Sequence, residues 1–125
     1  MRKLLNFLND DHGASTAEFG LVLIVFLSLI FAIIGLSLNI WANETLQFAT
    51  EAAARCASVT PSVCSNQSTI QTYGANHYLG PAISPTFTYA SGGACGHQVT
   101  ASATIPLDAV VVSLSVPLSA SACFP

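Results

Sequence analysis

Glu18 carries a carboxylate at the start of an apolar stretch that has no other charged side chain before Glu44. A carboxylate at bilayer depth costs about 2.5 kcal/mol or more, so a nearby group should neutralise it. Cleavage of the chain after Gly13 would create an α-amine at Ala14, about one helical turn before Glu18. That amine, on the same chain or on a packed neighbour, could supply the opposite charge.

Residues 1–13 have the features of a cytoplasmic leader peptide. Arg2 and Lys3 give it a basic start. The apolar run 4–8 is too short for the core of a secretory signal, and acidic residues interrupt it. The alternative is an ordinary signal anchor, in which the leader stays and Glu18 lies in the headgroup layer. The residues alone leave both interpretations open.

The segment after Glu18 is predicted to cross a membrane. Residues 19–42 carry few polar side chains, namely Ser28, Ser37, Asn39 and the indole of Trp41. At about 1.5 Å per residue, a helix of this length exceeds the ~30 Å hydrocarbon core of a bilayer. We expect the helix to cover 14–58. The two basic residues near the N-terminus predict that this end is cytoplasmic and that the rest of the chain lies outside.

Four segments of the sequence resemble a known family. The run Gly13-Ala-Ser-Thr-Ala-Glu-Phe-Gly-Leu-Val-Leu, after a basic leader, resembles the class III signal of type IV prepilins. In detail it looks like the TadE-like pseudopilins of the tight-adherence (Flp) pilus systems. Ala52-Ala-Ala-Arg-Cys-Ala is similar to the alanine-rich end of the family's N-terminal helix. Cys95-Gly-His-Gln-Val-Thr-Ala and Leu118-Ser-Ala-Ser-Ala extend the similarity toward the C-terminus.

The resemblance implies a role, partners and a location. Prepilin peptidase would cut between Gly13 and Ala14, and Glu18 with Phe19 would act in assembly. The partners would be other pilin or pseudopilin subunits, an inner-membrane assembly platform and membrane lipid. The chain would cross the inner membrane once, with a periplasmic C-terminal domain that could become extracellular in a pilus. Major pilins of this type are usually much shorter, which favours a minor pilin or pseudopilin.

The composition argues against several other functions. Charged residues make up 7% of the chain, against about 25% in typical globular proteins, and the net charge is −3. Nucleic acids require clustered Lys and Arg, so they are not expected partners. The exported part has only three acids and two histidines, Glu44, Glu51, Asp108, His77 and His97, and no recognisable catalytic motif. We therefore expect no enzyme activity, cofactor or small-molecule substrate.

Four cysteines, all located beyond the apolar segment, predict two disulfides in an exported domain. Three pairings are possible. We favour Cys56–Cys64, which closes a short loop, and Cys95–Cys123. The second pairing requires a bulge or a cysteine outside its strand, because Cys95 and Cys123 have opposite parities in the strand pattern. A zinc site is the alternative, but no CxxC pair supports it, so we expect no metal.

The predicted fold class is α+β. The long N-terminal helix is followed by a small disulfide-stabilised domain, 59–125, with a short helix within 69–79. Period-two alternation over 99–105 and 110–122 predicts strands with one buried face in an antiparallel sheet of three or four strands. Pro117 predicts an edge strand or a bulge. The alternative function is an uncleaved, single-pass, envelope-anchored binding protein that displays this domain.

Overall fold

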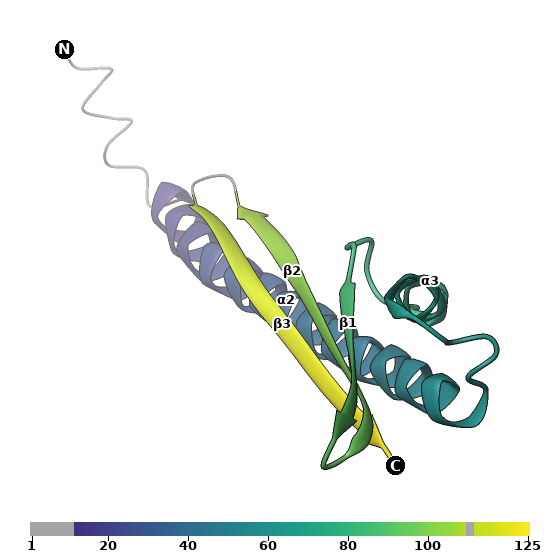
Figure 1. Cartoon of the computed structure of the whole chain (residues 1–125). Helices are drawn as coiled ribbons and strands as arrows, with labels where there is room; N and C mark the ends of the chain where they lie inside the picture. The colour runs from purple at the N-terminus through teal and green to yellow at the C-terminus, as the bar shows by residue number, and fades with distance from the viewer. Residues whose placement is uncertain (1–11, 110–111) are drawn as a thin grey trace. The chain divides into compact units, whose positions relative to one another are not determined.

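The computed structural model describes residues 12–109 and 112–125, so the predicted leader lies outside the described residues except for its last two positions. The elements are α2 (His12–Val59), α3 (Gln67–His77), β1 (Thr86–Gly93), β2 (Gly96–Ala109) and β3 (Val112–Phe124) (Figure 1). They form two compact units, one ending at Ser37 and one covering Leu38–Pro125, and α2 contributes to both. The predicted α+β class is confirmed, and the antiparallel sheet has three strands.

The C-terminal part of α2 provides one side of the core of the second unit. Its buried side chains recur at helical spacing and are mostly alanine: Ala42, Leu46, Ala49, Ala53, Ala54, Cys56 and Ala57. Thr50 is buried among them, and its hydroxyl donates to the carbonyl of Leu46 at 2.7 Å. Because these side chains are small, they leave room for the larger apolar side chains of the sheet, which belong to the same core.

The sheet has the order β1-β2-β3, with both neighbouring pairs antiparallel (Figure 1). Its buried side chains alternate along the strands, as the sequence predicts: Phe87, Val99, Ala101, Ala103, Ile105, Leu118, Ala120 and Ala122. The intervening positions are exposed and are mainly serine and threonine. One face of the sheet therefore joins the core, and the other is a hydroxyl-rich surface.

Both prolines of the β2–β3 hairpin occupy positions that tolerate a missing N–H group. Pro117 lies in β3, which is an edge strand of the sheet, as predicted. Pro106 lies in β2 beyond Ser102, the last β2 residue that pairs with β1. A proline in either position removes no hydrogen bond to a further strand, so the long hairpin keeps its register.

Two glutamine side chains of α3, one helical turn apart, hydrogen-bond to the outer edge of β1. Gln71 donates to the carbonyl of Pro85 at 3.0 Å and accepts from the amide of Phe87 at 2.6 Å. Gln67 donates to the carbonyl of Phe87 and accepts from the amide of Tyr89 at 2.7 Å. These contacts at alternate residues imitate a strand ladder. They occupy the edge to which a fourth strand would otherwise pair.

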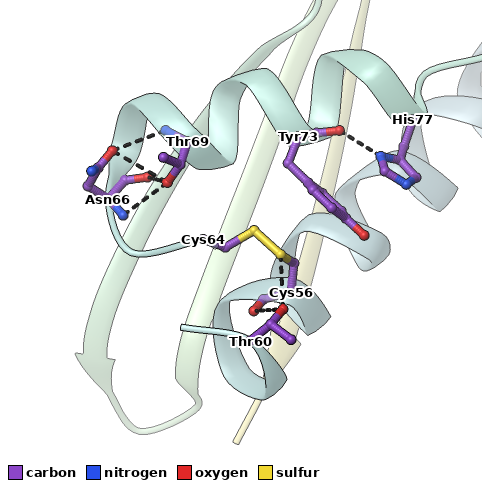
Figure 2. Close-up of a disulfide and its surroundings, with 7 residues drawn as sticks. All are labelled: Cys56, Thr60, Cys64, Asn66, Thr69, Tyr73 and His77. Atoms are coloured by element: carbon purple, nitrogen blue, oxygen red, sulfur yellow. Dashed lines mark hydrogen bonds between the residues drawn. A yellow bond between two sulfur atoms is a disulfide. The ribbon is translucent and has the colours of Figure 1, made fainter. Parts of the chain in front are cut away.

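The Cys56–Cys64 disulfide joins the end of α2 to the segment before α3, with the two Cα atoms 5.7 Å apart (Figure 2). Beside it, the hydroxyl of Thr60 donates to the carbonyl of Cys56 at 3.1 Å. α3 then begins with a capping box, in which Asn66 Oδ1 accepts from the amide of Thr69 at 3.0 Å and Thr69 Oγ1 accepts from the amide of Asn66 at 3.2 Å. The connection between the helices is thus fixed at both ends.

The second disulfide joins Cys95 to Cys123, so both favoured pairings are present. Cys95 lies in the turn between β1 and β2, since β2 begins at Gly96. This position outside the strand resolves the parity conflict. Gly96 has a φ of +85°, and a Cβ there would lie 2.9 Å from the carbonyl oxygen of Phe124. Glycine therefore allows the end of β3 to lie against the start of β2.

Gly74 lets α3 approach β1 closely. It is buried, and a Cβ at this position would lie 2.8–2.9 Å from three ring carbons of Phe87. Gly74→Ala gains about 1 kcal/mol of helix propensity. Overpacking against the ring costs about 1–3 kcal/mol, so we expect a lower thermal midpoint of unfolding. Circular dichroism of the full-length protein in detergent measures it.

Asn76→Ala is the matched control for Gly74→Ala, because it raises the helix propensity at an exposed position of the same helix. Its midpoint should equal or exceed that of the wild type. A Gly74→Ala protein as stable as this control would show that the Phe87 ring moves without cost.

Candidate functional site

The first turns of α2 hold the residues that the sequence singled out for cleavage and assembly. Gly13 and Ala14 lie in the first turn of the helix, which begins at His12. Amides of a first turn have no partner within the helix, so opening this turn breaks few hydrogen bonds. Glu18 and Phe19 are exposed, Phe19 by 67%. An α-amine at Ala14 would lie one turn, about 6 Å along the axis, before Glu18.

Removal of residues 1–13 would also change the electrostatic environment of Glu18. In the intact helix, no acidic residue lies in the first turn of α2. The helix dipole stabilises an anion mainly within that turn, so Glu18 gains little from it. A helix that starts at Ala14 would bring Glu18 close to the first turn and to the new amine. Cleavage and neutralisation of the carboxylate would therefore be coupled.

The helix that follows Glu18 is suited to a membrane. Ser15–Val59 is the one helix of the described residues that is long and apolar enough to cross a bilayer. The two hydroxyls of the apolar run 19–42 are paired within the helix, Ser28 donating to the carbonyl of Val25 at 2.7 Å and Ser37 to that of Ile33 at 2.9 Å. Internal pairing of this kind is what a hydrocarbon environment requires. These features support membrane anchoring.

A groove on the second unit was not predicted. It has a volume of about 450 Å³ and is lined by Phe48, Glu51, Ala52, Arg55, Cys56, Val59, Thr60, Tyr73 and Phe124. Arg55 is the only lysine or arginine after Lys3 in the sequence. That isolated cation, beside apolar residues at helical spacing, was the one signal of this groove in the sequence.

The two histidines of the second unit, His77 and His97, are each packed on a tyrosine. His77 donates to the carbonyl of Tyr73 at 2.8 Å and stacks on its ring (Figure 2). His97 is hydrogen-bonded to the hydroxyl of Tyr89 at 2.6 Å. Within residues 12–109 and 112–125, no group of three or more His, Cys, Asp or Glu side chains could hold a metal ion. The contacts seen at both histidines are therefore structural.

Residues 13–55 match the model of the TadE-like protein family. The match starts at Gly13, the residue before the predicted cut, and ends at Arg55. It confirms the predicted resemblance to TadE-like pseudopilins and indicates a protein associated with the Tad pilus. Comparisons with curated proteins and with solved structures gave no match.

Proposed function

Because residues 13–55 resemble the TadE-like family, we propose that this chain is a pseudopilin or minor pilin of a type IVb (Flp/Tad) pilus. Prepilin peptidase cuts it between Gly13 and Ala14. An inner-membrane assembly platform then transfers the mature helix into a fibre, or its initiation complex, built with other pilin or pseudopilin subunits. The observation that carries the proposal is an exposed carboxylate, Glu18, at the start of an apolar run, 19–42, that has no other charged side chain and lies within the matched region.

The proposed topology places the N-terminus in the cytoplasm and the second unit in the periplasm. Arg2 and Lys3 support this orientation through the positive-inside rule. The Cys56–Cys64 and Cys95–Cys123 disulfides also support it, because such bonds persist in oxidising compartments.

Cleavage prepares the helix for assembly by removing charge. The cut discards the basic leader and leaves one positive charge, the amine of Ala14, beside one negative charge, the carboxylate of Glu18. In an apolar surround the two attract strongly and neutralise each other. When the pair forms between adjacent subunits, it also fixes their axial register. The uncharged apolar run 19–42 then packs against the helices of neighbouring subunits.

The test is the N-terminus of the protein isolated from its native membrane. Intact mass and N-terminal sequencing should show a chain that begins at Ala14. Gly13→Arg should abolish cleavage, because a large charged residue replaces the small residue before the scissile bond. Ser15→Ala, a small change near the cut, is the control and should be cleaved normally. A wild-type protein that retains Met1, or normal cleavage of Gly13→Arg, would contradict the proposal.

A second candidate is an uncleaved, membrane-anchored binding protein. The groove lined by Arg55 and its neighbours favours it, since an exported domain with a hollow surface can bind a partner without entering a fibre. The same measurement of the N-terminus decides between the two candidates.

A further inference from the structure

The loop between α3 and β1 contacts α2 close to the end of the apolar run 19–42. It consists of residues 78–85 and belongs, with this part of α2, to the second unit (Figure 1). A Cβ at Gly80 would overlap the hydroxyl oxygens of Tyr78 and Thr45. The missing side chain of Gly80 therefore lets the loop lie directly on α2 at Thr45.

Thr45 lies at the depth of the lipid headgroups when the run 19–42 spans a bilayer. It follows Ala42, the last residue of the run, by about 4.5 Å along the helix axis. Lipid headgroups extend about 5–7 Å beyond the hydrocarbon core on each side. Trp41 lies one turn before Thr45 on the same side of α2 and is 47% exposed. Because tryptophan is enriched in the headgroup layer, Trp41 supports this depth.

The surface of the loop is apolar and uncharged. Leu79 is 72% exposed, more than any other large apolar side chain whose burial the structure describes. Ala82 is exposed as well, and the sequence has no Asp, Glu, Lys or Arg from 56 to 107. A single exposed leucine is common on soluble proteins and needs no explanation. Leu79 differs because its loop lies beside the end of a membrane-spanning run, on the side of α2 that carries Trp41.

We propose that the loop inserts into the headgroup layer of the leaflet next to the second unit, with Leu79 at the boundary of the hydrocarbon. No charged side chain of the loop has to leave water, so the insertion has no large desolvation cost. The lipid surface then holds the second unit at a second point besides α2. The inference rests only on the membrane span that both candidate functions share, and cleavage after Gly13 does not affect it.

Quenching of tryptophan fluorescence by brominated lipids tests the contact, because Trp41 is the only tryptophan of the chain. The full-length protein is reconstituted at a high lipid-to-protein ratio in vesicles of phosphatidylethanolamine and phosphatidylglycerol. The vesicles also contain phosphatidylcholine brominated near the headgroup end of its acyl chains. Wild-type Trp41 gives the reference. In a Trp41→Phe background, Leu79→Trp should be quenched to within about twofold of that reference, because both positions lie in the interfacial layer.

Val63→Trp in the same background is the matched control. Val63 is also an exposed apolar residue of the second unit, with 56% of its surface accessible. It lies in the turn after α2, whose end at Val59 is about 25 Å along the helix axis from Ala42. A tryptophan there should be quenched at least about threefold less than one at position 79, because it lies outside the interfacial layer.

A second pair of variants adds one negative charge to the Leu79→Trp protein. Ala82→Asp places a carboxylate on the loop and should roughly halve the quenching at position 79, because the charge keeps the loop in water. Ala90→Asp places the same charge at an exposed position of β1 and should leave the quenching unchanged.

Equal quenching at positions 79 and 63 would overturn the inference. An unquenched Trp41 would also overturn it, because the run 19–42 would then not span the bilayer. The N-terminus of the protein from its native membrane is a separate result. A mature chain that starts at Ala14, together with an unquenched position 79, overturns this lipid contact alone, whereas a retained Met1 overturns the proposed pilin function.

Discussion

Glu18→Ala is expected to be cleaved after Gly13 like the wild type but to be recovered in assembled fibres at a level at least about tenfold lower. The substitution leaves the amine of Ala14 without a counter-charge in an apolar surround. Removal of one partner of a desolvated charge pair costs about 2–5 kcal/mol, and each 1.4 kcal/mol corresponds to a factor of about ten. Assembly should therefore fail while the protein accumulates in the membrane.

Quantitative immunoblots of sheared surface fibres and of membranes measure this ratio. Ser28→Ala is the matched control, because it changes a polar side chain of the same helix whose hydroxyl bonds only to the carbonyl of Val25. It should assemble normally. Normal recovery of Glu18→Ala in fibres would show that neutralisation of the carboxylate is not what drives assembly.

The elements of the fold could be predicted because residues that are buried on one face of a helix or strand recur at a regular spacing in the sequence. The charge-free run after Glu18 marks a long helix, and strict alternation over 99–105 marks a strand with one buried face. Pro117 marks an edge strand because a proline cannot donate to a further neighbour. Each of these features depends only on residues that are close in sequence.

The packing of α3 could not be predicted, because it depends on residues distant in sequence. Gln67 and Gln71 are ordinary polar residues until β1 lies beside them and offers its backbone groups. A glycine inside a helix lowers the helix propensity by about 1 kcal/mol, but the missing side chain of Gly74 makes room for the ring of Phe87. No local pattern distinguishes such a glycine from one that ends a helix.

The candidate site, too, could be predicted from the sequence only in part. Glu18 is conspicuous because it is the one charge at the edge of an apolar helix, and the structure shows it exposed there. The groove beside Arg55 requires Tyr73 from α3 and Phe124 from β3, which only the tertiary fold brings to α2. The isolated Arg55 is visible in the sequence, but the groove that it lines forms only when α3 and β3 pack against α2.

Phe87→Ala is expected to be the most destabilising single substitution in the second unit. Phe87 is fully buried and is the largest of the fully buried side chains of the described residues. Truncation of a buried phenylalanine costs about 3–5 kcal/mol, a large part of the 5–15 kcal/mol that typically stabilises a domain. Denaturant unfolding of the full-length protein in detergent measures the loss. Phe48→Ala, at an exposed phenylalanine, is the control and should cost far less.

The double variant Gly74→Ala/Phe87→Ala tests whether the space at this contact is shared. In the wild type, the methyl group added at position 74 meets the Phe87 ring, so Gly74→Ala destabilises. Once the ring is gone, the same methyl group fills part of the cavity and keeps its gain in helix propensity. Gly74→Ala should then become neutral or stabilising. Additive losses in the double variant would mean that the two residues do not compete for one volume, and that Gly74 serves α3 in some other way.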